Sequence, residues 1–260
     1  MSLNFPDYRD IPLVKSPLTE VICQVRFPAI LRIGTSEPVD FQEAIRARFP
    51  MLEIEQGFIL RLPGMGTREP AVTEPSSRVY RFRTADDHSS VSLGTDFYSL
   101  STDMYTVWKH FASDLRLIHR AMRQTYRISF ATRIGLRYVN RITPANAVGV
   151  APDDLPDLLR PELASLIRTS AWSEPNELLS QVILKDGSHG NLALRVGFRR
   201  QEEEGPEILL DFDYYEEGEL ELNRIDARCA RYHDRIYQAF RWCIRDDRLE
   251  VFEPRRKGDA

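Results

Sequence analysis

Hydrophobic and polar side chains alternate most cleanly between Phe130 and Ile142, near the middle of the chain. Read at a period of two residues, one face of this stretch carries Phe130, Thr132, Ile134, Leu136, Tyr138, Asn140 and Ile142. The other face carries Arg133, Arg137 and Arg141, with successive arginines roughly 13 Å apart on an extended strand. The pattern predicts a long β-strand with one basic face.

Shorter alternating stretches predict further strands on both sides of this one. The first is Leu18–Phe27, which ends at Pro28 because proline cannot donate to a strand ladder. The others are predicted at Phe58–Leu62, Arg78–Thr84, Ser90–Gly94, Phe97–Ser101, Leu178–Lys185, Asn191–Arg200 and Glu207–Tyr215. Asp186 and Gly187 suit the tight turn of a hairpin. The Pro- and Gly-rich loop Pro63–Ser77 is expected to be mobile, a candidate lid.

Two long helices are predicted from stripes of apolar residues. The first stripe is Met104, Trp108, Phe111, Leu115, Ile118, Met122 and Tyr126. The second is Ile225, Cys229, Tyr232, Ile236, Ala239 and Cys243, within a helix of about Asn223–Arg245 that Asn223 would cap. Shorter helices are expected at Val39–Phe49 and at Asp153–Ile167, the latter broken at Pro161.

The order of these elements is similar in the two halves of the chain. Residues 1–128 and 129–252 each read as a β-α-β-β-β-α unit, followed by a flexible tail at 253–260. We therefore expect an α+β fold in which two pseudo-duplicated units share a curved antiparallel sheet, with the long helices on one face. In element order this resembles the saddle of the TATA-box-binding protein, a likeness that does not fix function.

Composition and charge narrow the classes of function. The net charge of the 260-residue chain is −4, which argues mildly against a duplex-DNA binder. No run approaches the roughly 18 apolar residues of a membrane-spanning helix, and the N-terminus does not read as a secretory signal. Cys229 and Cys243 would lie about 21 Å apart on one helix, too far to bridge. These features predict a reduced, cytoplasmic, bacterial protein.

Two segments resemble a known family. Ser16-Pro17-Leu18-Thr19-Glu20-Val21 with Gln24-Val25-Arg26-Phe27, and Arg133 to Ile142, resemble the opening and middle strands of a sporadically distributed family of uncharacterised bacterial proteins of about this length. The resemblance covers most of the chain and carries no known activity and no catalytic residues. Its patchy distribution implies an accessory setting linked to defence or toxin–antitoxin genes.

The arginines are the main candidate for a binding surface. Those predicted on the helix-free side of the sheet include Arg26, Arg81, Arg133, Arg137, Arg141, Arg195 and Arg199. Asn140 is a candidate to orient a ligand there. Because guanidinium groups suit carboxylates and phosphates, this face could bind an anionic ligand, an acidic peptide or nucleic acid. The alternative is that Glu20, Glu207, Asp211 and Asp213 neutralise the arginines across strands.

No sequence motif of a known catalytic or cofactor site is present. The chain lacks a Gly-x-Ser-x-Gly elbow, a phosphate-binding glycine loop and a dinucleotide fingerprint, and no cofactor is expected. Asp211 and Asp213 alone are too few for a metal site. The sequence therefore predicts a non-catalytic protein that binds a partner protein or an anionic ligand, with homo-oligomers left open. The alternatives are a nucleic-acid-binding protein and an enzyme of unrecognised type.

Overall fold

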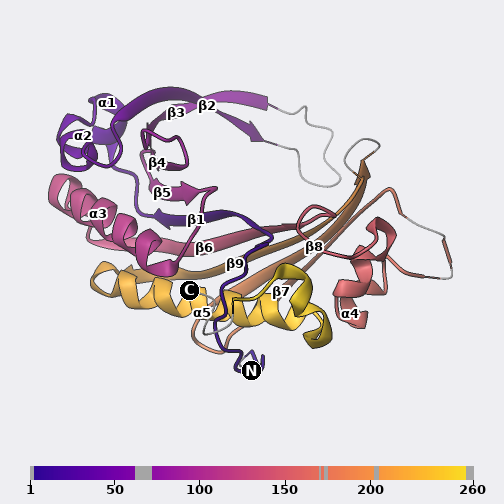
Figure 1. Ribbon diagram of the computed structural model, residues 1–260. Coiled ribbons are helices and arrows are strands. Elements are labelled where there is room, and N and C mark those ends of the chain that lie inside the picture. Colours follow the sequence, from indigo (N-terminus) through magenta and orange to yellow (C-terminus); the bar gives the residue numbers. More distant parts are fainter. Residues whose placement is uncertain (1–2, 62–71, 170, 173–174, 202–204, 256–260) are drawn as a thin grey trace. The chain divides into compact units, whose positions relative to one another are not determined.

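The computed structural model describes residues 3–61, 72–169, 171–172, 175–201 and 205–255 (Figure 1). Its strands form a nine-stranded antiparallel sheet in the order β2-β3-β4-β5-β1-β6-β9-β8-β7, and the fold is α+β as predicted. The strands are β1 Leu18–Arg26, β2 Met51–Arg61, β3 Val72–Arg83, β4 Ser89–Leu93, β5 Phe97–Thr102, β6 Phe130–Ile142, β7 Glu177–Lys185, β8 Asn191–Gln201 and β9 Gly205–Glu221.

The helices are short except for two. The α-helices are α1 Leu31–Thr35, α2 Val39–Ile45, α3 Trp108–Tyr126, α4 Pro161–Ala164 and α5 Ile225–Cys243, and the 3₁₀ segments are η1 Pro152–Leu158, η2 Leu222–Arg224 and η3 Asp246–Phe252. Among the described residues, none of these helices is long and apolar enough to cross a membrane.

The chain divides into two compact units. Unit 1 contains residues 1–22, 135–217 and 223–260, and unit 2 contains residues 23–134 and 218–222. In unit 2, strands β2 to β5 follow one another as an antiparallel meander. Its helix α3 packs on this meander, where the buried His119 contacts the Tyr98 hydroxyl at 2.8 Å and Phe41 of α2 packs edge-on against Phe82.

Unit 1 is built on the antiparallel strands β7, β8 and β9, with α5 running beside them (Figure 1). Phe212 and Tyr214 of β9 pack on Phe240 and Tyr232 of α5, with ring centroids 6.5 and 4.8 Å apart. Because successive side chains of a strand point to opposite faces, Asp211 and its alternate neighbours lie on the side away from α5. We call that side of unit 1 the open face.

Several sequence predictions are confirmed. Strand β6 has the bounds predicted from its alternation, and the predicted hairpin is present, with Gly187 at a φ of 58° in its turn. The six residues of the predicted α5 stripe are all buried. Cys23, Cys229 and Cys243 are buried and none of them is in a disulfide.

Other predictions were wrong at element ends. Helix α3 begins at Trp108, so Met104 lies outside the apolar stripe and is exposed. Asn223 does not cap α5, whose N-cap is Arg224, because the preceding residues form η2. Part of the predicted loop, residues 72–77, belongs to β3, and the rest of it, 63–71, lies outside the described residues.

The predicted tail is also only partly outside the described residues. Residues 253–255 are held by backbone hydrogen bonds to the N-terminal segment. Val14 donates to the Glu253 carbonyl, and Arg255 donates to the Pro12 carbonyl. The segment from 253 is therefore fixed as far as Arg255, because it pairs with the start of the chain.

Candidate functional site

Four of the predicted arginines gather on the open face of unit 1. Arg137 and Arg141 come from β6, and Arg195 and Arg199 come from β8. Strand β9 lies between β6 and β8 in the sheet and carries the two carboxylates that they meet, those of Asp211 and Glu207. The alternation of β6 and β8 predicts the side of the sheet on which these arginines lie, but not that β9 lies between the two strands.

Asp211 is held by two arginines. Arg137 donates from Nε to Oδ1 at 2.7 Å and from Nη2 to Oδ2 at 2.8 Å, while Arg195 donates from Nη1 to Oδ2 at 2.9 Å. Asp211 is only 1% exposed, so these donors replace the water that an ionised carboxylate requires. The hydrogen bonds that Arg137 donates to Asp211 raise the pKa of the Arg137 guanidinium above its ordinary value.

Glu207 is held in the same way by the other two arginines. Arg141 donates from Nη1 to Oε1, and Arg199 donates from Nη2 to Oε2 at 3.3 Å. Cross-strand ion pairing, the alternative reading of the arginine pattern, is therefore confirmed for all four residues. Two arginines and one carboxylate give each group a formal charge of +1, and Glu177 adds a second carboxylate beside the Arg141 group because it is opposite Arg199. The four arginine side chains are 31–46% exposed.

The remaining predicted site residues lie elsewhere. Asn140 is buried on the α5 side, where its amide donates to the Leu210 carbonyl at 3.1 Å, so the idea that it orients a ligand on the open face was wrong. In unit 2, Arg26 donates to Gln24 and Arg81 pairs with Glu55 at 3.1 Å, while Arg133 lies in the part of β6 that belongs to that unit.

A hollow on the open face lies between the two arginine groups, and sequence reasoning missed it. Leu179 of β7 is opposite Gly197 of β8, and Gly197 is opposite Leu209 of β9. Since glycine has no side chain, a space of about 210 Å³ opens above it, lined also by Arg141 and Arg199. A Cβ on Gly197 would lie 3.2 Å from the Leu209 Cβ, so any larger residue would fill the floor.

A pair of charged residues lies on each side of the Gly197–Leu209 pair along the strands. Arg199 and Glu207 are opposite each other one step along the strands in one direction, and Arg195 and Asp211 are opposite each other in the other direction. Each step of two residues is about 7 Å. The open face thus presents a depression above Gly197 with Leu179 and Leu209 on its apolar part and Arg141, Glu177, Arg199 and Glu207 along one side. The row of Arg195 and Asp211 lies about 7 Å away on the other side.

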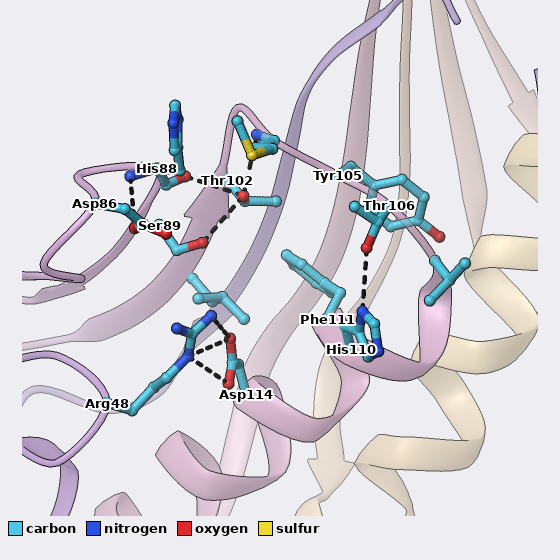
Figure 2. Close-up of a pocket in the computed structure, with 13 residues that line it drawn as sticks. Arg48, Asp86, His88, Ser89, Thr102, Tyr105, Thr106, His110, Phe111 and Asp114 are labelled. Carbon is cyan, nitrogen blue, oxygen red and sulfur yellow. Dashed lines mark hydrogen bonds and ion pairs between the residues drawn. The ribbon is translucent and has the colours of Figure 1, made fainter. Parts of the chain in front are cut away.

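Unit 2 has a second hollow of about 230 Å³, which Figure 2 shows. Its apolar wall includes Phe111 of α3. Its polar wall includes Arg48, which binds Asp114 with a fork of hydrogen bonds of 3.1–3.2 Å. That pairing raises the pKa of Arg48. The Thr84 hydroxyl lowers the pKa of Asp86 on the opposite side.

The polar groups of the second hollow are hydrogen-bonded to one another. Ser89 donates its hydroxyl proton to Thr102 at 3.0 Å, and Thr106 lies 3.1 Å from Nδ1 of His110. The His88 ring contacts Asp103 at 2.8 Å and is directed away from the Arg48 side of the hollow (Figure 2). Thr106 and His110 are a hydroxyl hydrogen-bonded to an imidazole, which is the first part of the arrangement that covalent catalysis requires. Among the described residues that line the hollow, no carboxylate is hydrogen-bonded to the His110 ring to complete that arrangement.

The residues that the structure describes include no cluster suited to a metal ion, and the buried Asp211 of the open face is already paired. No three His, Cys, Asp or Glu side chains gather among these described residues as ligands for an ion. Asp211, which together with Asp213 is too few for a metal site, is enclosed by Arg137 and Arg195. A carboxylate with that surrounding is a fixed structural anion rather than an accessible base.

Comparison with known proteins adds no relative to this argument. No family model matches the chain, and no curated protein is significantly similar to it. Function has to be argued from the geometry of the described residues.

Proposed function

We propose that this protein is a non-catalytic binding protein whose partner contacts the open face of unit 1. The observation that carries the proposal is the hollow above Gly197, where the aliphatic side chains of Leu179 and Leu209 lie beside ion-paired arginines. Burial of an aliphatic side chain there would contribute roughly 1.5–3 kcal/mol. The exposed guanidinium N–H groups would orient the ligand.

The spacing of the open face suits an extended polypeptide. Alternate side chains of an extended segment are about 7 Å apart, which matches the distance between the hollow and each arginine row. An aliphatic residue seated over Gly197 would place an Asp or Glu two positions away beside Arg141 and Arg199, or beside Arg137 and Arg195. We therefore infer a partner protein that presents an aliphatic residue next to carboxylates, rather than a small free anion, which would have to compete with Glu207 and Asp211.

Selection from a displayed library of random peptides on the immobilised protein tests this proposal. The enriched peptides are expected to combine an aliphatic residue with Asp or Glu two positions away. Their affinity should fall about tenfold or more for Gly197→Val, which fills the hollow, and for Arg199→Gln, which removes one positive charge. Val182→Thr is the matched control, because Val182 is exposed on the other face of the neighbouring strand.

The proposal fails if the selected peptides bind wild type and Gly197→Val equally well. Circular dichroism and thermal unfolding of each variant distinguish a lost site from a lost fold. A peptide that depends on the acidic residue but not on the hollow would support a simpler electrostatic surface and would remove the role of Gly197.

A nucleic-acid-binding protein is the second candidate, and the strand order is the observation that favours it. Reading outward from the middle, β1 is followed by β5, β4, β3 and β2 on one side, and β6 is followed by β9, β8 and β7 on the other. This order supports an internal duplication of the kind found in saddle-shaped sheets. The ion pairs of the open-face arginines weigh against this function. Failure to retain single- or double-stranded nucleic acid at low salt would remove it.

The cellular setting is part of the same proposal. We infer a cytoplasmic protein, because three buried cysteines without a disulfide suit a reducing compartment. An accessory, defence-linked bacterial role is what the family resemblance implies. Deletion of the gene and its neighbours, followed by challenge of the host, would test that role independently of the binding site.

A further inference from the structure

Strand β7 forms one end of the strand order and pairs only with β8 among the described strands. Its nine residues, Glu177–Lys185, contain no proline or glycine and pair with β8 without a shift in register. Leu179, Val182 and Ile183 are 66%, 43% and 55% exposed. Every second residue of such an edge directs its N–H and C=O groups outward, which makes a long, exposed, apolar edge strand a template for another strand.

The strand at the other end of the order is built differently. Strand β2 has a register shift between Gln56 and Phe58, and its Glu53 and Glu55 pair with arginines of β3. Bulges and charges of this kind are the usual protection of an edge against pairing. Strand β7 has no bulge and has charges only at its two ends, so its edge is open to pairing.

The sequence of β7 is complementary to itself in the antiparallel direction. When two copies are centred on Gln181, Glu177 of one copy is opposite Lys185 of the other, and Leu179 is opposite Ile183. A two-fold axis at Gln181 therefore gives two Glu177–Lys185 pairs and two Leu179–Ile183 pairs at the same time. Cross-strand pairs of both kinds stabilise a sheet.

Neighbouring registers lose this match. Centring on Ser180 places Glu177 opposite Ile183, and centring on Val182 places Leu179 opposite Lys185. We propose that the protein forms a two-fold symmetric homodimer through antiparallel pairing of β7, centred on Gln181, which joins the two sheets and places both open faces on one side. This inference does not depend on ligand binding in the hollow above Gly197.

Charge reversal at the ends of β7 tests the proposed register. Sedimentation velocity of the wild-type chain in the micromolar range should show a species of twice the chain mass of 30.1 kDa. Glu177→Lys or Lys185→Glu alone opposes like charges twice in each dimer and should weaken the dimer about tenfold. The double variant restores opposite charges at both positions and should recover the wild-type dissociation constant.

Disulfide cross-linking tests the position of the two-fold axis without changing the charge of β7. Gln181→Cys should form a covalent dimer on mild oxidation, since the axis brings the two copies of residue 181 about 5 Å apart. Leu179→Cys is the control, because its two copies would be about 13 Å apart, beyond the reach of a disulfide. The native cysteines are buried and give no background.

Three results would overturn the proposal. The first is a wild-type chain that remains monomeric throughout the concentration range, which would leave the edge for a strand of a different protein. The second is a double charge-reversal variant that is as weak as the single variants while its thermal unfolding is unchanged. The third is cross-linking of Leu179→Cys as fast as that of Gln181→Cys.

Discussion

Replacement of Asp211 by Ala removes the carboxylate that joins β6 to β8 on the open face. Asp211 accepts three charge-assisted hydrogen bonds, two from Arg137 and one from Arg195, and is 1% exposed. Without it, two guanidinium groups of like charge stay side by side. Arg195 keeps its hydrogen bond to Gln181 at 2.7 Å. Arg137 loses the two hydrogen bonds that it donates to Asp211.

The size of the effect follows from burial. Removal of one partner from a fully buried ion pair costs about 3–5 kcal/mol, because the other charge is left without water. The side chains of Arg137 and Arg195 are 43% and 31% exposed and can turn toward solvent, which recovers part of that cost. We therefore expect Asp211→Ala to lower the free energy of unfolding by about 2 kcal/mol, and the melting temperature by about 4–8 °C.

Urea unfolding followed by circular dichroism measures this change, and a double-mutant cycle identifies its origin. Arg137→Ala should cost at least about 1 kcal/mol less in the Asp211→Ala background than in wild type. Glu219→Ala, an exposed position on the same strand, is the control and should stay within about 0.5 kcal/mol of wild type. An Asp211→Ala cost below about 0.5 kcal/mol, or an additive cycle, would refute the claim that this carboxylate fixes the open face.

Two further predictions concern groups that the open face does not include. Burial lowers the pKa of His233, whose Nδ1 lies 2.8 Å from the Tyr138 hydroxyl. Below about pH 6.5 the unfolded chain binds a proton at this histidine that the folded chain does not, so the free energy of unfolding decreases as the pH is lowered. His233→Gln should flatten the slope of unfolding free energy between pH 7 and about pH 5, and a slope equal to that of wild type would contradict this. Asp186→Ala should cost about 2–3 kcal/mol in urea unfolding, because the buried Asp186 accepts from Arg235 at 3.0 Å; a cost like that of a surface change would contradict this.

The extent of prediction from sequence is clearest for β6. Its alternation over Phe130–Ile142 gave both the bounds of the strand and the side on which Arg137 and Arg141 lie, because a period of two residues is a local property. The same alternation could not show which carboxylates those arginines meet. That depends on the register of β9, which places Asp211 and Glu207 within reach although they are distant in sequence.

The hollow and the Asp186 contacts show why the rest of the site could not be predicted. In the sequence, Gly197 indicates only a strand position of low β-propensity. It forms the floor of the hollow because Leu179 and Leu209 lie opposite it on the neighbouring strands. Asp186 was correctly assigned to a turn, but its pairing with Arg235 arises from the packing of α5. In both cases the contacting residue is distant in sequence, and local propensity and hydrophobic pattern do not predict such tertiary contacts.

Site-specific photo-cross-linking tests the central claim, that a partner is bound on the open face, most directly. A photo-reactive amino acid at Leu179 is expected to cross-link to the selected acidic–aliphatic peptide, because this side chain borders the hollow above Gly197. The same amino acid at Val182, exposed on the opposite face of β7, should give no cross-link. Equal cross-linking from both positions, or cross-linking from Val182 alone, would contradict the account.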